Sequence, residues 1–462
     1  MEKLKAKIQL HWTTPQKLTL SFVFIIFFGG FLLSLPISHR TTAPPTVFLD
    51  HLFTAVSMIC VTGLTVLDVG AVYNNLGQII CIALMQIGGL GLITIISASM
   101  YYLNKKMSLK DQYFLQEALN RGTNDDFISF LMSVYKFTFS VEAIFACILM
   151  IDFIPRWGLG RGMFNSIFVA VSAFCNAGFD NFGSTSLQKF IGNPIVNFVV
   201  TSLIICGGLG FSVWFELRQK TKEYLSSKPR ILRLTFRNLS VHTRLAITAT
   251  VVVLTLGTTI GWLVEHNNPN TIGNLPLWQQ WMASYFQAVT MRTAGFATIN
   301  YENSHPFSNL MYIFQMIIGG APGGTAGGIK VTTAAMLFLL FISELKGYSQ
   351  VVYHKRTLPS YLLKQAMTIT LFFLSALMVG FSLLLLTEPN PDPFKIMFEA
   401  VSAICTVGVS MNYTGQLTTW GRIIIMSMMF IGRVGPITVL ISIISQRKKY
   451  EVRYADAEVL LS

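Results

Sequence analysis

The sequence is poor in charged residues. Asp, Glu, Lys and Arg together make up 12% of its 462 residues, against the roughly 25% usual for soluble domains. Hydrophobic residues make up 52%. A chain with this balance cannot cover a water-soluble globule with polar surface, so we predict a membrane protein.

Acidic residues are the scarcer charge type, with 21 Asp and Glu against 34 Lys and Arg and a net charge of +13. If the amino terminus is cytoplasmic, 24 of the basic residues fall on the cytoplasmic side, as the positive-inside rule requires for an even number of spans. The basic excess therefore indicates topology, and we expect no nucleic-acid binding. The segments concerned are 1–17, 104–126, 216–244, 343–364 and 446 onward.

Cysteine and histidine are also scarce, with six and seven copies. The cysteines lie in apolar stretches, which predicts small buried residues rather than a disulfide framework. The histidines have no metal-ligand spacing. The apolar runs carry no paired carboxylates and no nucleophile with a base, so we predict that the chain is not an enzyme and holds no cofactor.

Apolar runs long enough to cross a membrane occur eight times. About 20 residues are needed to span about 30 Å of hydrocarbon. The runs lie near 18–35, 77–101, 128–151, 194–215, 245–264, 309–342, 366–387 and 420–445. We therefore predict an all-α polytopic membrane protein with eight transmembrane helices.

Between each odd run and the next lies a shorter apolar segment, and these four segments resemble one another. They read FTAVSMICVTGL (53–64), FVAVSAFCNAGF (168–179), FQAVTMRTAGF (286–296) and FEAVSAICTVGV (398–409). Their glycines, at 63, 178, 295 and 408, are 115, 117 and 113 residues apart, which indicates a duplicated unit. Each unit is a span, a short helix, a glycine loop and a second span.

The second spans share a motif as well, which reads IGGLG at 87–91, CGGLG at 206–210, IGGAP at 318–322 and IGRVG at 431–435. Small residues alone would let helices pack closely, but close packing does not explain why each short segment stops halfway. A half-spanning helix is tolerated at membrane depth only where it is buried in protein or lines a wet cavity. Four of them predict a shared central pore.

The expected ligand of that pore is a cation. Each short helix ends just before its glycine, so its C-terminus, with roughly half a negative charge, points at the centre. Glycine permits the backbone angles that turn loop carbonyls inward. There the carbonyls can replace the water around an ion, as in potassium-channel filters.

With four span, pore-loop and span units and one glycine in each loop, the sequence resembles the Ktr/Trk/HKT superfamily of potassium transporters, and within it the membrane subunit of the bacterial Ktr system. The resemblance covers nearly the whole chain and implies four repeats around a pseudo-fourfold pore. The extra pair of helices ahead of the first unit in Trk-type members has no counterpart here. Carried over by position, the selectivity filter consists of Val61, Thr62, Gly63, Asn176, Ala177, Gly178, Thr293, Ala294, Gly295, Thr406, Val407 and Gly408.

The resemblance also implies a function and partners. Glycine in all four loops goes with potassium selectivity in the family, whereas serine in the first loop goes with sodium transport in some plant members. Sodium-dependent potassium uptake would fit the family, although no residue here indicates it. A homodimer on a cytoplasmic ring of nucleotide-binding subunits is implied, so nucleotide is expected only on that partner. Anionic lipid is the alternative partner of the basic loops.

Two basic residues lie inside apolar runs. Arg433 stands where the other three units have a glycine, and a mid-span charge is costly and usually functional. Below the filter it would limit cation flow, as the family arginine does. The alternative is an ion pair with Glu142 or Glu399. Lys330 either reaches the pore or extends to the inner surface.

The third unit contains the stretch GGAPGGTAGGIK at 319–330. It fails the phosphate-loop pattern because Ile329 stands where lysine is required. Glycine and proline destabilise helices, so we predict a broken helix facing the cavity. The resemblance makes it a movable gate, and a fixed packing kink is the alternative. The gate residues are Gly319, Gly320, Ala321, Pro322, Gly323, Gly324, Thr325, Ala326, Gly327 and Gly328.

The predicted protein lies in a bacterial plasma membrane with both termini in the cytoplasm. Asp68 and Asp180, which follow two of the glycines, either concentrate cations at the outer mouth or are solvated loop charges. The rival hypothesis is a non-transporting sensor or structural subunit of a cation-pumping complex. The predicted segments are an N-terminal arm (1–17), repeat 1 (18–103), a cytoplasmic loop (104–127), repeat 2 (128–217), a basic cytoplasmic loop (218–243), repeat 3 with the gate (244–342), a cytoplasmic loop (343–360), repeat 4 (361–445) and a cytoplasmic tail (446–462).

Overall fold

The computed structural model describes residues 14–91, 127–183, 185–226, 236–389 and 392–435. Residues 104–126 of the predicted cytoplasmic loop, the tail from 446 and most of the N-terminal arm lie outside the described residues. Within them the chain is helical apart from one hairpin of two-residue strands. The predicted all-α class is therefore confirmed.

Each repeat has a long first helix, a short second helix and a third helix. In chain order these are α1 (Thr14–Ser34), α2 (Phe48–Ile59) and α4 (Asn75–Leu90); α7 (Phe127–Trp157), α8 (Leu159–Phe174) and α9 (Pro194–Gly208); α12 (Val241–Glu265), α13 (Leu277–Thr290) and α14 (Pro306–Ile317); α16 (Ser360–Thr387), α17 (Pro393–Ile404) and α18 (Thr419–Val434). The connecting elements are η1 (Pro36–Ser38), α3 (Val69–Val72), η2 (Gln188–Phe190), α10 (Phe211–Ser226), η3 (Tyr301–Asn303), α15 (Val331–Leu345), β1 (Val352–Tyr353), β2 (Arg356–Thr357) and η4 (Thr414–Gln416).

The first helices of repeats 2, 3 and 4 are the clearest spans. Among the described residues, α7, α12 and α16 are each long and apolar enough to cross a membrane. Helices α9 and α10 meet the same test only together, and they are bent by 98°. The expected straight run near 194–215 is thus bent, because Gly210 between the two helices has a φ of 85°, which a helix cannot contain.

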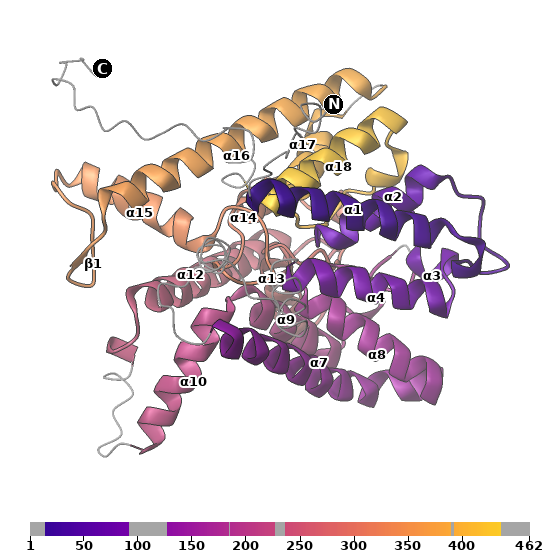
Figure 1. Ribbon diagram of the computed structural model, residues 1–462, viewed down its shortest axis with the longest axis horizontal. Helices are drawn as coiled ribbons and strands as arrows, with labels where there is room; N and C mark the ends of the chain where they lie inside the picture. The colour runs from indigo at the N-terminus through magenta and orange to yellow at the C-terminus, as the bar shows by residue number, and fades with distance from the viewer. Residues whose placement is uncertain (1–13, 92–126, 184, 227–235, 390–391, 436–462) are drawn as a thin grey trace, which may run out of the picture.

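The repeats pack in a closed cycle. The third helix of each repeat contacts the short helix of the next, in the pairs α4 with α8, α9 with α13, α14 with α17, and α18 with α2. The last pair joins the two ends of the chain, and Figure 1 shows the yellow helix α18 beside the indigo helices of repeat 1. An ion pair of 2.5 Å between Arg422 of α18 and Asp50 of α2 links them further.

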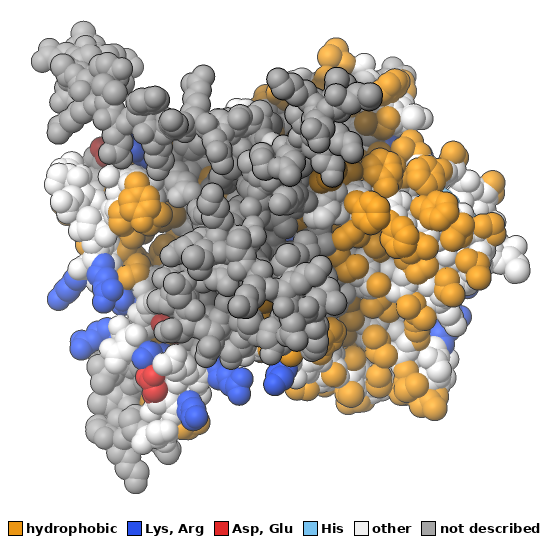
Figure 2. All heavy atoms as spheres, viewed as in Figure 1, with side chains coloured by type: hydrophobic (Ala, Val, Ile, Leu, Met, Phe, Trp, Pro, Cys, Tyr) orange, Lys and Arg blue, Asp and Glu red, His pale blue; other side chains and the backbone are white. Residues whose placement is uncertain are grey.

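The described surface is apolar over a broad area. Phe24, Leu371 and Trp420 are each about two-thirds exposed, at 67%, 66% and 68%, which is costly in water and normal against lipid. Figure 2 shows apolar side chains over the part of the surface formed by α1 and α4, whereas Lys and Arg gather mainly at the opposite end, over α10 and β1. This separation fits a membrane protein with one basic face.

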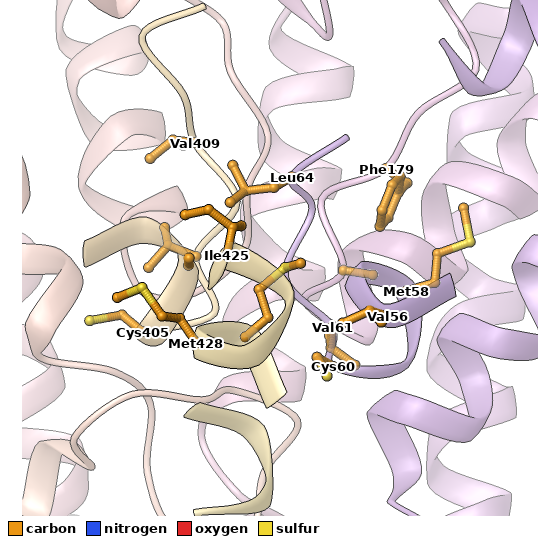
Figure 3. Packing of buried hydrophobic residues seen from close by; sticks show 14 of the residues in the cluster. Val56, Met58, Cys60, Val61, Leu64, Phe179, Cys405, Val409, Ile425 and Met428 are labelled. Carbon is orange, nitrogen blue, oxygen red and sulfur yellow. The ribbon is translucent and has the colours of Figure 1, made fainter. Parts of the chain in front are cut away.

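The core surrounds the glycine loops. Figure 3 shows Val56, Cys60 and Val61 of repeat 1 and Cys405, Ile425 and Met428 of repeat 4 packed beside the same loops. All six side chains are at least nine-tenths buried. Close-packed interiors resist displacement, so the core fixes the position of each loop.

Candidate functional site

All four glycine loops share one backbone pattern. Two residues in each loop have left-handed backbone angles, with one residue of ordinary φ between them. The pairs are Val61 and Gly63 (56° and 103°), Asn176 and Gly178 (59° and 71°), Thr293 and Gly295 (70° and 85°), and Thr406 and Gly408 (52° and 96°). This alternation sets successive peptide groups on one side of the chain, whereas in a β-strand they alternate between two sides.

The pattern is strained and must be held in place. Val61, Thr293 and Thr406 are β-branched, and a left-handed backbone costs such residues on the order of 1–3 kcal/mol each. The last amide before each glycine is bound by the carbonyl of a serine or threonine in the short helix. These bonds run from Thr62 to Ser57, Ala177 to Ser172 and Val407 to Ser402, each 2.8 Å, and from Ala294 to Thr290, 2.9 Å.

The hydroxyls of the same residues add further bonds. The Gly63 amide donates to Ser57 Oγ at 3.1 Å, and the Gly408 amide donates to Ser402 Oγ at 3.0 Å. Thr290 Oγ1 donates to the Phe296 carbonyl at 2.7 Å. Sequence reasoning missed these residues, although the repeated V-S or V-T pair in the four segments was a signal for them.

The four glycines form a closed ring. A methyl group on Gly63 would lie 2.9 Å from the Ala177 carbonyl oxygen, one on Gly178 2.6 Å from that of Ala294, and one on Gly295 2.7 Å from that of Val407. A methyl group on Gly408 would meet the Thr62 carbonyl oxygen and complete the cycle. The ring therefore has no room for a side chain, and carbonyl oxygens from all four loops lie beside it.

A cavity of about 350 Å³ opens on one side of the ring. It is lined by all four glycines and by residues that follow them, including Asp68 and Asp180. Asp68 caps α3 by accepting from the amides of Gly70 and Ala71. Burial raises the pKa of Asp180 to about 6, and the nearby Asp68 carboxylate adds to the rise. The two acidic residues thus lie together at one mouth of the ring.

The glycine-rich stretch of the third repeat lies on the other side of the ring. It forms a loop between the end of α14 at Ile317 and the start of α15 at Val331. The Gly327 amide donates to Thr293 Oγ1 at 3.3 Å, and a methyl group on Gly327 would meet Thr406 Oγ1. Both threonines precede their glycines, whereas the cavity is lined by residues that follow the glycines. The loop and the cavity therefore lie at opposite ends of the ring.

The loop is docked onto the second repeat. Its anchors are the broken end of α9 and the end of the short helix α8. The bonds run from Ala321 N to Gly208 O (2.8 Å), Thr325 N to Gly207 O (3.0 Å), Phe211 N to Gly323 O (3.1 Å) and Thr325 Oγ1 to Phe174 O (3.1 Å). The bend between α9 and α10 thus supplies the backbone groups that hold the loop.

Arg433 binds the same loop from the fourth repeat. Its guanidinium donates to the Thr325 carbonyl at 2.5 Å and to the carbonyls of Gly88 and Gly89 at the end of α4. Arg433 therefore connects three repeats. Among the described residues it forms no ion pair with Glu142 or Glu399, which was the alternative expected from the sequence.

Lys330 lies at the far end of the loop. Its ammonium donates to the Ala326 carbonyl at 2.5 Å, within the loop itself. The residue is half-buried. Lys330 thus binds a carbonyl of the loop itself.

One position near the ring differs between repeats. The residue three before each glycine is Cys60, Cys175 or Cys405 in three repeats and Arg292 in the third. Arg292 is 4% exposed, donates to Thr250 Oγ1 at 3.3 Å, and has no partner for its Nε among the described residues. The sequence analysis did not single out Arg292, although the aligned segments show arginine there in place of the cysteine of the other three repeats.

Comparisons with known proteins agree along nearly the whole chain. The TrkH family, described as cation transport protein, matches residues 4–451. Ktr system potassium uptake protein B of Bacillus subtilis is 36% identical over 99% of this chain and 99% of its own. Potassium/sodium uptake protein NtpJ of Enterococcus hirae is 35% identical over the same shares. The potassium transporter TrkH of Vibrio parahaemolyticus has a similar fold, with a TM-score of 0.72 at 16% identity over 94% of this chain and 86% of that one.

Proposed function

Because the chain belongs to the TrkH family of cation transport proteins, we propose that it carries potassium into the cell through a pore at the ring of four glycines. Family membership confirms the predicted family and the expectation of a multi-pass membrane transporter rather than an enzyme. The closed cycle of repeats around the ring is the observation that carries the proposal.

The ring serves as the selectivity filter. Its ligands are the carbonyls of the twelve loop residues, and the short helices direct the negative ends of their dipoles at it. Such carbonyls replace the water of a potassium ion as it enters. Relatives named for potassium uptake, and one named for potassium and sodium uptake, support these two ions as substrates. The membrane potential drives entry with about 2.3 kcal/mol per charge per 100 mV.

The loop from Gly319 to Gly328 serves as the gate. It lies at the end of the ring away from the outer cavity and touches Thr293 and Thr406 of the filter. Hydrogen bonds to repeats 2 and 4 hold it through a few donors and acceptors, so rupture of a small set would release it. Arg433 holds it closed and adds a positive charge below the filter, and Lys330 stiffens it.

The partners follow from the names of the relatives and from the basic face. Several relatives are Ktr system proteins, which supports a homodimer on a ring of nucleotide-binding subunits in the cytoplasm. The hairpin of β1 and β2 presents an exposed basic tip, with Lys355 and Arg356, at the end where Lys and Arg gather. Anionic lipid headgroups are the other class of partner for this face. The protein would lie in the plasma membrane with both termini in the cytoplasm.

Growth and uptake in cells that lack potassium uptake test the function. We expect the chain to restore growth at low potassium and to take up rubidium, more strongly when a nucleotide-binding partner is present. If neither growth nor rubidium uptake is restored, with or without the partner, transport is refuted and the sensor or structural-subunit hypothesis is favoured. Flux into vesicles with sodium present or absent would then decide sodium dependence.

A single glycine tests the filter. In Gly63→Ser the side chain would enter the ring next to the Ala177 carbonyl at a φ of 103°. We expect rubidium uptake to fall at least tenfold relative to sodium uptake. Gly160→Ser is the matched control, because a Cβ there meets nothing within 4 Å. An unchanged rubidium-to-sodium ratio in Gly63→Ser would reject the filter assignment.

A further inference from the structure

A buried acidic residue in the second repeat takes no part in the proposed filter or gate. Glu142 is the middle residue of α7, which runs from Phe127 to Trp157. It is 5% exposed. Acidic residues at mid-membrane are rare and usually mark an ion or proton site. The hydrogen-bond partners of this carboxyl group show which of the two it is suited to.

The carboxyl group lacks adequate partners. Its Oε2 accepts from the Gln86 amide of α4 at 3.5 Å, the outer limit of a hydrogen bond. Its Oε1 has no hydrogen-bond partner among the described residues. No described lysine or arginine pairs with it, and Arg433 is occupied by three backbone carbonyls.

A second unpaired oxygen lies one helical turn away. Thr138 is fully buried, and its Oγ1 also has no hydrogen-bond partner among the described residues. Residues four apart face the same side of a helix, with about 5–6 Å between their Cβ atoms. The Thr138 hydroxyl and the Glu142 carboxyl group therefore share one face of α7, yet no hydrogen bond joins them.

We propose that Glu142 and Thr138 form a binding site for one sodium ion, separate from the filter, and that the Gln86 amide positions the carboxylate by donating to its other oxygen. The oxygen atoms of a carboxylate and a hydroxyl are hard ligands suited to such an ion. A single carboxylate neutralises one positive charge, so a divalent ion would leave excess charge in apolar surroundings. A carboxylate exerts a stronger field than carbonyls, which favours sodium over potassium where field strength decides selectivity.

A bound cation would engage both unpaired oxygens at once, because the carboxylate and the hydroxyl can each offer it a lone pair. The site also contacts the filter region, because the Cys175 thiol donates to Gln86 Oε1 at 3.6 Å and Cys175 ends the short helix α8. A sodium ion bound at Glu142 would therefore act, through Gln86, on Cys175, which precedes the left-handed Asn176.

Direct binding tests the site. Radioactive sodium is titrated into the purified full chain in lipid nanodiscs, with potassium in excess to occupy the filter. We expect one sodium ion per chain, and at least tenfold weaker binding in both Glu142→Gln and Thr138→Val. Ser140→Ala, which removes an exposed hydroxyl from the same helix, should bind sodium as the wild type does.

Two results would overturn the inference. One is the absence of sodium binding to the wild-type chain, and the other is equal binding in Glu142→Gln, which would mean that the carboxyl group is simply protonated. Retained rubidium binding shows that the variants are folded. The inference is distinguishable from the proposed function, because a wild-type chain that binds sodium but never takes up rubidium would refute transport alone.

Discussion

The third repeat and the other three treat the same stretch of backbone differently. In repeats 1, 2 and 4 the third helix continues into the shared motif and then meets a left-handed glycine, at Gly91, Gly210 or Gly435. In repeat 3 the helix stops at Ile317, ahead of the motif, and Pro322 stands where those glycines would be. A left-handed glycine thus follows the third helix in repeats 1, 2 and 4, whereas in repeat 3 a separate loop follows that helix.

The contacts of the motif differ accordingly. A methyl group on Gly88, Gly207 or Gly432 would meet the last carbonyl of the short helix in the same repeat. At the equivalent Gly319 it would meet the Gly327 carbonyl of the loop instead. In repeat 3 the loop thus occupies the place beside the ring that the end of a short helix occupies in the other repeats. Duplication places the same motif at four equivalent positions. The motif of repeat 3 alone departs from the shared arrangement, so its loop is the best candidate for a moving part.

Deletion of Ala321 to Ala326 should have the largest effect, because it removes what distinguishes repeat 3. Loss of the hydrogen bonds from Ala321 and Thr325 is worth roughly 3 kcal/mol at about 1 kcal/mol each, or about a hundredfold in the open fraction. Rubidium flux into proteoliposomes should rise by at least tenfold. A monodisperse variant with wild-type flux would mean that the loop is a fixed kink.

Arg433→Gln should have the next largest effect. It removes charge-assisted bonds to Thr325, Gly88 and Gly89, worth about 2 kcal/mol, and a charge that opposes cation entry. We expect flux to rise by about thirtyfold. Arg237→Gln, at an exposed position, is the charge-matched control, and equal flux in the two variants would remove Arg433 from the gate.

Arg292→Cys would make the third repeat like the other three. At about 10 Å and an effective dielectric of about 20 a buried positive charge opposes a cation by roughly 1.5 kcal/mol. Apparent rubidium affinity should therefore rise by about tenfold, whereas Arg292→Lys should leave it unchanged. The fold should tolerate the change, since replacing a poorly paired buried charge is often neutral or stabilising. Equal affinities in the two variants would contradict this.

Thr325→Val should have a smaller effect of the same sign as the deletion. It keeps the shape of the loop but loses the bond from Thr325 Oγ1 to the Phe174 carbonyl. That bond is worth about 1 kcal/mol, or about fivefold in the open fraction. Thr325→Ser keeps the hydroxyl and should behave as the wild type. A flux below that of the wild type in Thr325→Val would show that the bond favours the open state.

The outer mouth gives the smallest predicted effect. Because the pKa of Asp180 is raised to about 6, its carboxyl group is charged above that pH and neutral below it. Lowering the external pH from about 7.5 to about 5 should weaken rubidium affinity by about twofold, through loss of a charge that attracts cations. Asp180→Asn should show the weaker affinity at both values, and a full pH response in that variant would exclude Asp180 as its source.

Much of this arrangement could be predicted from the sequence because duplication makes local signals reinforce one another. Four glycines at similar spacing located the loops, and the glycine and proline run located the broken helix before α15. Periodicity alone did not reveal the 98° bend after Gly208. That bend depends on the loop that docks against it, which lies more than a hundred residues further along the chain.

The partners of individual side chains were harder to predict. Arg433 donates to the Gly88 carbonyl, 345 residues away, and a backbone carbonyl leaves no mark in the sequence. Charge complementarity therefore predicted Glu142 or Glu399 as the partner, and among the described residues Arg433 forms an ion pair with neither. Ser57 and its equivalents were visible in the repeats, but their role depends on the left-handed backbone of the folded loops.

The central claim is that the ring of four glycines holds the transported ion. A structure determined in rubidium or thallium, whose strong scattering marks the ion, tests this most directly. The account predicts density on the axis of the ring, within coordination distance of the carbonyls of Thr62, Ala177, Ala294 and Val407, and its loss in Gly63→Ser. A ring without ion density in the wild-type protein, with ions bound only elsewhere, would contradict it.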